Sequence, residues 1–435
     1  MSGASKARGD RVTYADIFAV REFRALFISR GLSTIGDYLA RSALTIAVFV
    51  ETGSTALMGI TFALTMLPDL IGGPLLGSLA DRFPRRALMV AADVGRALLL
   101  LVMAIPGLPL FALWALLFVI RLLDGPFLSA YHSSMAVVLP GKQQLVKGTA
   151  VTQLINHVAY TVGYGLGGLI VGLTGLSAVL VLNAGTFVVS GVVILLGMLA
   201  RPATANPDSP PTLLGAARAA TRYIVGHPRL RVIMLFPFPI AITLVCETLA
   251  APYAAQIGHG SSVAGLLMGA APAGIVLGLW LLPMVMPDQR AGHVMALSIM
   301  SCVPLVVFAA MPSPVVAAIL VVASGIPLYF WIPLSAEFAQ TVPDDMRGQA
   351  MGLMTTTMKV TQGIAVLSFG LIAQNTMAST VIAASGAIGT VMTIALSLAW
   401  VRASRPATTA AAPPEVAPEA TPSHDDAIPR SDHHH

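Results

Sequence analysis

The feature that most constrains this chain is a series of long apolar stretches that recur along nearly its whole length. An α-helix rises about 1.5 Å per residue, so about 20 consecutive apolar residues cross the hydrocarbon core of a bilayer. Twelve stretches reach this length, and short segments rich in Gly, Pro or charge separate them. The sequence therefore predicts an all-α membrane protein with twelve transmembrane helices.

The predicted spans form two sets of six, separated by a longer polar segment. Those of the first half are residues 23–50, 55–80, 87–105, 109–135, 149–172 and 176–199, and those of the second are residues 232–256, 262–285, 293–311, 314–340, 348–373 and 378–401. We expect two pseudo-symmetric six-helix bundles at 23–200 and 232–401, a cytoplasmic N-terminal segment at 1–22, a cytoplasmic linker at 201–231 and a disordered cytoplasmic tail at 402–435.

The loops between the spans alternate in charge. Cytoplasmic loops of membrane proteins carry an excess of Lys and Arg. Here basic residues occupy every second loop as well as the two terminal segments: Arg82, Arg85 and Arg86; Lys142 and Lys147; Arg201 to Arg231; Arg290; and Arg347. The alternation predicts an even number of spans, with both termini on the cytoplasmic side of the cell's inner membrane.

Composition excludes several other classes of protein. With 56% hydrophobic and 10% charged residues, the chain has too little polar surface for a soluble globule of 435 residues. The net charge of +5 is scattered between apolar stretches, so nucleic acid is not an expected partner. Cys246 and Cys302 lie in apolar stretches, and the sequence has no phosphate loop and no His/Glu cluster with metal-ligand spacing within a span. We expect no enzyme, cofactor or metal site, and we assign no metal role to the three C-terminal histidines.

The two halves align with each other. Residues 33–37 (Ser-Thr-Ile-Gly-Asp) match residues 243–247 (Thr-Leu-Val-Cys-Glu), so an acid recurs at the same place in the first and seventh spans. Gly59 matches Gly265 at the offset that also relates Gly72 to Gly278. Secondary transporters built from such repeats place their binding site near the bilayer midplane, at the interface between the halves.

The loop after the second span carries the most specific motif. Residues 77–86 read Gly-Ser-Leu-Ala-Asp-Arg-Phe-Pro-Arg-Arg. This resembles the signature Gly-x-x-x-Asp-Arg-x-Gly-Arg-Arg of the major facilitator superfamily. Gly77, Asp81, Arg82, Arg85 and Arg86 stand at its fixed positions, while proline replaces the second glycine. The resemblance implies a cytoplasmic latch that holds the inner face closed in the outward-open state. A loop whose positive charge only fixes orientation is the alternative.

Two further motifs resemble those of the same family. Gly163, Gly167 and Gly168 fit its antiporter glycine motif, with tyrosine in place of proline, although ordinary small-residue packing explains them too. Arg121 fits an Arg-x-x-x-Gly pattern whose arginine is associated with proton coupling. Because Arg121 and Asp124 are three residues apart, a self-neutralising local pair remains an equal alternative. Asp93 and Arg96 repeat that spacing, and there we favour the structural interpretation.

Asp37 and Glu247 are the strongest candidates for coupling protons to substrate. Each lies near the centre of a predicted span, where an ionised carboxylate costs several kcal/mol unless it is paired, solvated or protonated. A carboxyl in such a place can load and release a proton as access alternates. Arg41 lies one turn beyond Asp37, so a permanent intrahelical ion pair is the alternative for that site. Asp69 and Lys359 are further intramembrane charges, and a pair between them across the halves is an open interpretation.

Aromatic residues in the spans are candidates for lining a substrate cavity. The set comprises Tyr38, Tyr160, Tyr164, Phe236, Phe238, Tyr253, Tyr329 and Trp331. Most aromatic residues of a helical bundle pack against neighbours or lipid, so we expect only a minority to touch substrate.

The resemblance covers residues 20–400 and is closest to the branch with macrolide-efflux proteins and siderophore exporters, through residues 36–37, 79–86 and 342–348. It implies a monomeric exporter of a small hydrophobic or amphipathic compound, such as a drug, antibiotic or siderophore-like metabolite, by proton antiport. The partners would be the small molecule, protons and the lipid bilayer, and multidrug resistance is a possible phenotype. The alternative is a proton-coupled uptake carrier for a small nutrient on the same fold.

Overall fold

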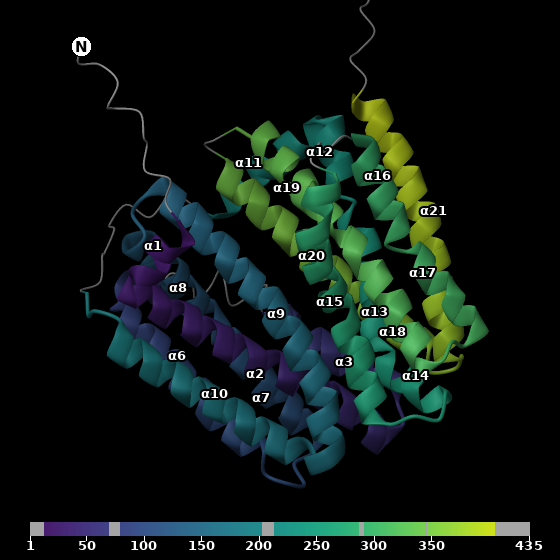
Figure 1. The fold of residues 1–435 in the computed structure, drawn as a ribbon, viewed down its shortest axis with the longest axis horizontal. Helices are drawn as coiled ribbons and strands as arrows, with labels where there is room; N and C mark the ends of the chain where they lie inside the picture. The colour runs from purple at the N-terminus through teal and green to yellow at the C-terminus, as the bar shows by residue number, and fades with distance from the viewer. Residues whose placement is uncertain (1–12, 69–78, 202–212, 287–290, 344–345, 405–435) are drawn as a thin grey trace, which may run out of the picture.

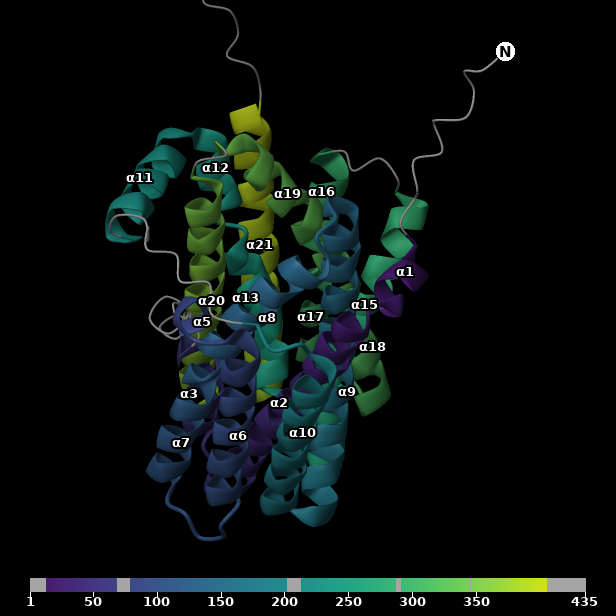
Figure 2. The ribbon, with the colours of Figure 1, turned by 90° about the vertical axis from the view of Figure 1, so that its left-hand side faces the viewer.

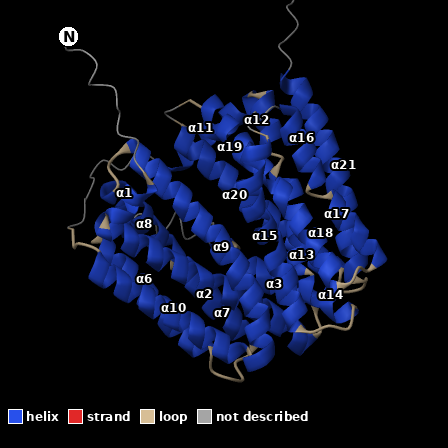
Figure 3. Ribbon diagram, viewed as in Figure 1, coloured by secondary structure: helices blue, strands red, loops and turns tan. Residues whose placement is uncertain are grey.

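The computed structural model of the chain describes residues 13–68, 79–201, 213–286, 291–343 and 346–404. These residues form helices joined by short loops, and they contain no β-strand (Figure 3). The predicted all-α class is confirmed.

Helices of the first half begin and end close to the predicted spans. They are α1 (Tyr14–Ala19), α2 (Arg21–Thr52), α3 (Thr55–Leu64), α5 (Leu79–Arg82), α6 (Arg85–Met103), α7 (Leu110–Leu122), α8 (Asp124–Val138), α9 (Lys142–Thr174) and α10 (Leu176–Gly197). Gly53 and Gly175 have positive φ values of 65° and 80°, which let the chain turn sharply after α2 and α9.

Helix α11 (Leu213–Gly226) lies in the segment between the predicted halves, and α12 (Pro228–Ile233) runs from that segment into the seventh predicted span. The second half follows with α13 (Pro237–Thr248), α14 (Ala250–Gln256), α15 (Ser261–Val285), α16 (Ala291–Met300), α17 (Val303–Val306), η1 (Val307–Ala310), α18 (Pro314–Gly325), η2 (Ile326–Phe330), α19 (Trp331–Thr341), α20 (Arg347–Ile372) and α21 (Ala378–Ser404). Each of the twelve predicted spans contains at least one described helix.

Eight described helical stretches are long and apolar enough to cross a bilayer. They are Leu110–Val138, Lys142–Thr174, Leu176–Gly197, Pro228–Thr248, Ser261–Val285, Gly292–Ala310, Pro314–Thr341 and Ala378–Ala403. Helices α2, α6 and α20 are also long, but charged and polar residues within them lower their hydropathy. The chain is a multi-pass membrane protein.

Boundaries differ from the predicted ones by a few residues at the two ends. The predicted N-terminal segment contains helix α1, which Thr13 caps through its side chain, and α2 already begins at Arg21. At the other end, α21 continues to Ser404, two residues past the predicted start of the tail at 402. The remainder of the predicted tail and residues 1–12 lie outside the described residues.

The helices form two groups that lie side by side (Figure 1). Helices α2 and α6 to α10 make one group, in which α2 packs against α9 and α10, and α10 against α6. The other group joins α13, α15, α18, α20 and α21. Helix α1 and the C-terminal end of α21 lie toward the same end of the molecule, as Figure 2 also shows. We call this the terminal end, and the opposite one the far end.

Two close helix contacts join the groups near the far end. A Cβ added at Gly168 of α9 would lie 2.3 Å from Cα of Gly265 in α15, so only glycine lets these backbones approach so closely. On the other side, a Cβ at Gly59 of α3 would lie 3.5 Å from Cα of Gly370 in α20. We call these two contacts the glycine seam. The aligned residues Gly59 and Gly265 thus take matching places in it.

Candidate functional site

A cavity of about 580 Å³ lies between the two groups of helices, on the terminal side of the glycine seam. Side chains of α2, α7, α8 and α9 line it from the first half, and side chains of α13 and α20 line it from the second. Its volume falls within the range of pockets that hold drug-sized ligands. Among its lining residues are Arg30, Tyr38, Arg41, Met66, Arg121, Asp124, Gly125, Leu128, Ser129, His132, Tyr160, Leu244, Met358, Lys359 and Gln362.

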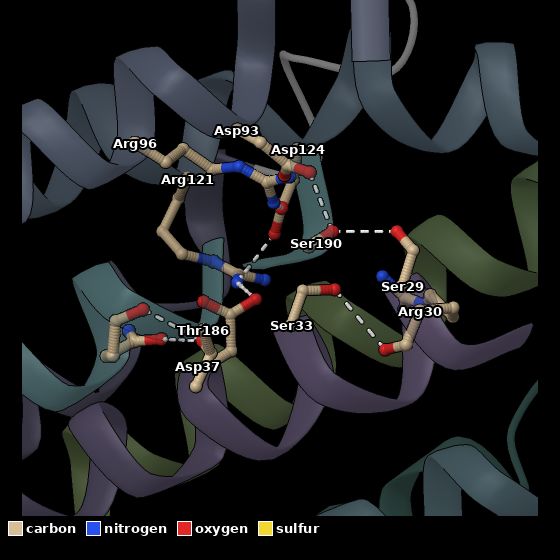
Figure 4. A network of polar contacts seen from close by, with 11 residues as sticks. Ser29, Arg30, Ser33, Asp37, Asp93, Arg96, Arg121, Asp124, Thr186 and Ser190 are labelled. Carbon is tan, nitrogen blue, oxygen red and sulfur yellow. Dashed lines mark hydrogen bonds and ion pairs between the residues drawn. The ribbon is translucent and has the colours of Figure 1, made fainter. Parts of the chain in front are cut away.

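Beside the cavity, the first half holds a buried network of charges (Figure 4). Arg96 of α6 is 1% exposed and forms ion pairs with Asp93, at 2.5 Å, and with Asp124 of α8. The Asp93 carboxylate accepts a hydrogen bond from Ser190 of α10 at 2.7 Å, and Ser190 meets Ser29 of α2. The pair predicted from the spacing of Asp93 and Arg96 is present, and it ties three helices together.

The same network continues to Asp37. Arg121 lies 2.6 Å from an Asp124 oxygen and 3.6 Å from an Asp37 oxygen, so one guanidinium joins the two carboxylates. Its Nε donates to the backbone carbonyl of Thr65 at 3.0 Å. The predicted local pair of Arg121 and Asp124 is therefore formed, and it also reaches the candidate proton site.

Arg41 does not take the role of ion-pair partner that its spacing suggested. It donates to the Thr65 carbonyl at 3.3 Å and lies 5.2 Å from the centre of the Tyr38 ring, while the ion pair described for Asp37 is with Arg121. A second cavity of about 30 Å³, large enough for a water molecule, lies between Asp37, Arg41 and Arg121.

The surroundings of Glu247 differ from those of Asp37. It lies on α13, is 4% exposed, and accepts a hydrogen bond of 2.6 Å from the hydroxyl of Tyr160 on α9. No ion pair to Glu247 occurs within the described part of the chain. This carboxyl group of the second half is therefore held by a neutral partner from the first.

An aromatic cluster lies between the two carboxyl groups. Tyr160 stacks on Tyr38 with ring centres 4.3 Å apart, and Tyr164 meets both rings edge-on at 4.7 and 5.2 Å. Since Arg41 lies over Tyr38, the cluster links the surroundings of Glu247 to those of Asp37.

Two residues of the predicted glycine motif hold α9 against α2. A Cβ at Gly163 would lie 2.7 Å from the Ile35 carbonyl oxygen, and one at Gly167 would lie 1.9 Å from Oγ of Ser42. Gly168 faces α15 in the glycine seam. All three glycines thus permit close helix approach, and their packing brings the tyrosines of α9 next to Tyr38.

The predicted latch motif is described in part. Gly77 lies outside the described residues, as does the side chain of Asp81, while Arg82 is exposed at the end of α5. Arg85 donates to the carbonyl of Ser133 at 3.0 Å, and Arg86 donates to that of Leu195. These contacts lie within the first half.

Of the aromatic residues predicted to line a cavity, Tyr38 and Tyr160 line the large one. Tyr164 is fully buried in the tyrosine cluster, and Phe236 packs against Phe330 in a core of the second half. Tyr253 packs on Phe308 and donates to the Pro312 carbonyl, while Trp331 packs at the edge of the Phe236 core. These four residues do not line the large cavity: Tyr164, Phe236 and Tyr253 are buried, and Trp331 is partly buried.

Sequence reasoning missed two groups that the structure brings to the site. Arg30 lines the large cavity, and Asn183 of α10 lines the small one beside Asp37. Arg30 lies inside a predicted span seven residues before Asp37, so its charge was a usable signal. Asn183 was unrecognisable because no sequence pattern links it to Asp37. Asp69, the predicted partner of Lys359, lies outside the described residues.

Buried charges that line a cavity between two packed helix bundles are the arrangement expected of a membrane transporter. The chain belongs to the Major Facilitator Superfamily, whose family model matches residues 26–342. The resemblance seen in the sequence is thereby confirmed, and the family is one of transporters.

Several known transporters are similar to this chain. It is 25% identical over 348 residues to the enterobactin exporter EntS of Citrobacter koseri, covering 77% of this chain and 80% of that protein. It is 29% identical over 170 residues to the uncharacterized MFS-type transporter YfiS of Bacillus subtilis, covering 39% of this chain and 40% of that protein. A crystal structure of the nucleoside transporter NupG, in its D323A mutant form, superposes with a TM-score of 0.72 at 13% identity, over 88% of this chain and all of that one. The last similarity shows the fold alone.

Proposed function

We propose that the protein exports a small amphipathic compound by proton antiport and alternating access. Relatives named as enterobactin exporters match over most of the chain at about one quarter identity, which favours export. The nucleoside transporter NupG shares the fold without being named as an exporter, so a proton-coupled uptake carrier is the second candidate.

The observation that carries the proposal is the setting of Glu247. Its side chain is buried beside a cavity between the halves, and its hydrogen-bond donor comes from the opposite half. An ionised carboxylate in such a place is costly without a cation, while a protonated one is not. A change of access that moves Tyr160 relative to α13 changes this balance and moves a proton.

Asp37 is the second proposed proton site. Arg121 lies between it and Asp124, so protonation of Asp37 frees the guanidinium to pair with Asp124 alone. Arg121 and Arg41 are then groups that respond to the charge of Asp37 and position it.

The orientation follows from the charge of the loops. We propose that the terminal end faces the cytoplasm of a bacterial cell across its inner membrane, in line with the basic loops. Because the glycine seam joins the halves at the far end, the structure then corresponds to an inward-facing state. The arginines of the 77–86 loop would engage the second half only in the opposite state.

Paired neutral substitutions test the proposal. In proteoliposomes with a trapped pH dye, a compound library is screened for substrates whose movement releases protons. We expect Glu247→Gln and Asp37→Asn each to reduce proton-coupled transport of a substrate so found by at least about 100-fold, because an amide cannot carry the proton. Glu51→Gln, the same change at an exposed residue of the far end, is the matched control.

Two outcomes would count against the proposal. Full coupled transport in both variants would remove Asp37 and Glu247 from the proton path. Accumulation of substrate together with protons, rather than exchange for them, would favour the uptake carrier.

A further inference from the structure

The large cavity carries an excess of positive charge. Among the described lining residues, Arg30, Arg41, Arg121 and Lys359 are cationic, and Asp124 is the one carboxylate. Asp124 already accepts ion pairs from Arg121 and Arg96, so its charge is shared within the network of the first half.

Two of these cations have no carboxylate partner within the described residues. Arg41 is held by a carbonyl oxygen and an aromatic ring, both of which are neutral. The guanidinium of Arg30 forms no ion pair to a described side chain, and the residue is half-buried at the cavity wall. Cations held in a site of low dielectric without a directly paired carboxylate are costly, and an anionic ligand offsets that cost.

The rest of the wall is apolar. Tyr38, Met66, Leu128, Leu244 and Met358 present rings and aliphatic groups between the charges. Lys359 lies on α20 of the second half, whereas Arg30 and Arg41 lie on α2 of the first. A ligand that complements both the apolar and the cationic side chains of the cavity therefore needs an apolar body and a negatively charged group.

We propose that the cavity selects amphipathic anions, with Arg30 and Arg41 as the residues that recognise the acidic group. This rests on the proposed function and narrows its substrate to compounds with a carboxylate, sulfonate or similarly acidic group. An inside-negative membrane potential favours the exit of such an anion, by about 2.3 kcal/mol per charge and 100 mV.

A matched pair of fluorescent probes tests the charge preference directly. 1-Anilinonaphthalene-8-sulfonate and N-phenyl-1-naphthylamine share one ring system, and only the first carries a sulfonate. Each is titrated into the purified full-length protein in nanodiscs, with empty nanodiscs subtracted. We expect the sulfonate to bind at least about tenfold more tightly than the neutral probe.

Variants identify the residues responsible. Arg30→Gln and Arg41→Gln should each weaken sulfonate binding about tenfold and change binding of the neutral probe less than about twofold. Arg30→Lys should restore most of the affinity, since it keeps the charge. Arg402→Gln, which removes an exposed arginine at the end of α21, is the control. Size-exclusion profiles check that each variant is folded, and Arg30→Gln breaks no ion pair with a described side chain.

Equal affinity for the two probes, or sulfonate binding that survives both glutamine substitutions, would overturn the inference. The assay uses no gradient, so its result is independent of transport direction. Charge-selective binding without export would overturn the proposed function alone. Export of compounds without regard to their charge would overturn the anion preference alone.

Discussion

The two halves of the molecule share one arrangement of helices and differ sharply in what they bury. In the first half, α2, α6, α7 and α8 bring three carboxylates and two guanidiniums into one connected network, with the Arg96 side chain 1% exposed. In the second half, Glu247 is the one charged residue classed as buried within the described chain, and apolar clusters surround it. The two halves thus share a fold, but the groups that they bury differ in charge.

The aligned acids make the same contrast at single residues. Asp37 faces a guanidinium of its own half, whereas Glu247 faces a tyrosine hydroxyl of the other half. In the proposed alternating access, a contact within one half would move with that half, whereas a contact between halves would be remade. Glu247 is therefore the acid whose surroundings depend most directly on the conformational state.

Removing the central cation of the first half should have the largest effect on stability. Arg96→Met leaves Asp93 and Asp124 facing each other without that cation, and breaking a buried ion pair by removing one partner costs about 3–5 kcal/mol. Glu247→Gln in the second half should cost about 1 kcal/mol or less, because the amide oxygen still accepts the Tyr160 hydrogen bond.

Thermal unfolding of both variants in the same detergent measures this difference. A similar shift in midpoint temperature for Arg96→Met and Glu247→Gln would mean that the charged network of the first half is not a special contributor to stability.

A smaller loss of stability should follow from a substitution that pushes the halves apart at the glycine seam. In Gly168→Ala the new methyl group meets the backbone of Gly265, and overpacking of this kind costs about 1–3 kcal/mol. Gly165→Ala, on the same helix, meets no atom within 4 Å and should be neutral or slightly stabilising.

The glycine seam lies near the far end of the molecule. Gly168→Ala should therefore also shift the population away from the conformation described. Spin labels placed on the two halves at the far end would report a longer or broader distance distribution. An unchanged distribution in Gly168→Ala would show that the seam does not set the separation of the halves.

The smallest expected effect concerns an ion pair of the first half outside the predicted spans. Arg201 donates to both carboxylate oxygens of Glu22, at 2.9 and 2.6 Å, and Leu199 donates its N–H. Burial opposes the effect, but these hydrogen bonds keep the pKa of Glu22 below its ordinary value of 4.5. Since Arg201 is 41% exposed, Glu22→Gln should cost about 1 kcal/mol or less.

The sign of its pH dependence follows from the lowered pKa. The contribution of Glu22 is fully present above pH 4.5 and is lost as the pH falls through the lower pKa of the folded state. Unfolding temperatures of the parent protein and Glu22→Gln should therefore differ at pH 7 and converge as the pH falls below the lowered pKa of the folded state. A gap that widens in acid would contradict the assignment.

Periodicity and charge made much of the fold predictable from sequence. Every predicted span contains a described helix, and the match between Gly59 and Gly265 anticipated related places in the seam, because close backbone contact demands glycine. The acids at 37 and 247 were found because charge in an apolar span is conspicuous.

What each charge contacts was less predictable. Spacing along one helix suggested Arg41 as the partner of Asp37, but the partner comes from α7, because the turn between α7 and α8 carries Arg121 into the bundle. The hydrogen bond between Tyr160 and Glu247 joins residues 87 positions apart, which no local pattern reports. Aromatic residues were poor markers of the cavity, because large apolar rings pack between helices as readily as they line a cavity.

The far end holds one more polar detail, at Gln374. Its amide oxygen accepts hydrogen bonds from the hydroxyls of Ser54 and Thr55 and from the N–H of Ala56, at 3.0, 3.2 and 3.1 Å. Water can replace Ser54 and Ala56 at little net enthalpic cost, since both are half-buried and Gln374 is exposed, whereas Thr55 is buried. We expect these hydrogen bonds of Gln374 to cost little to break if the halves separate at the far end in the proposed alternating access.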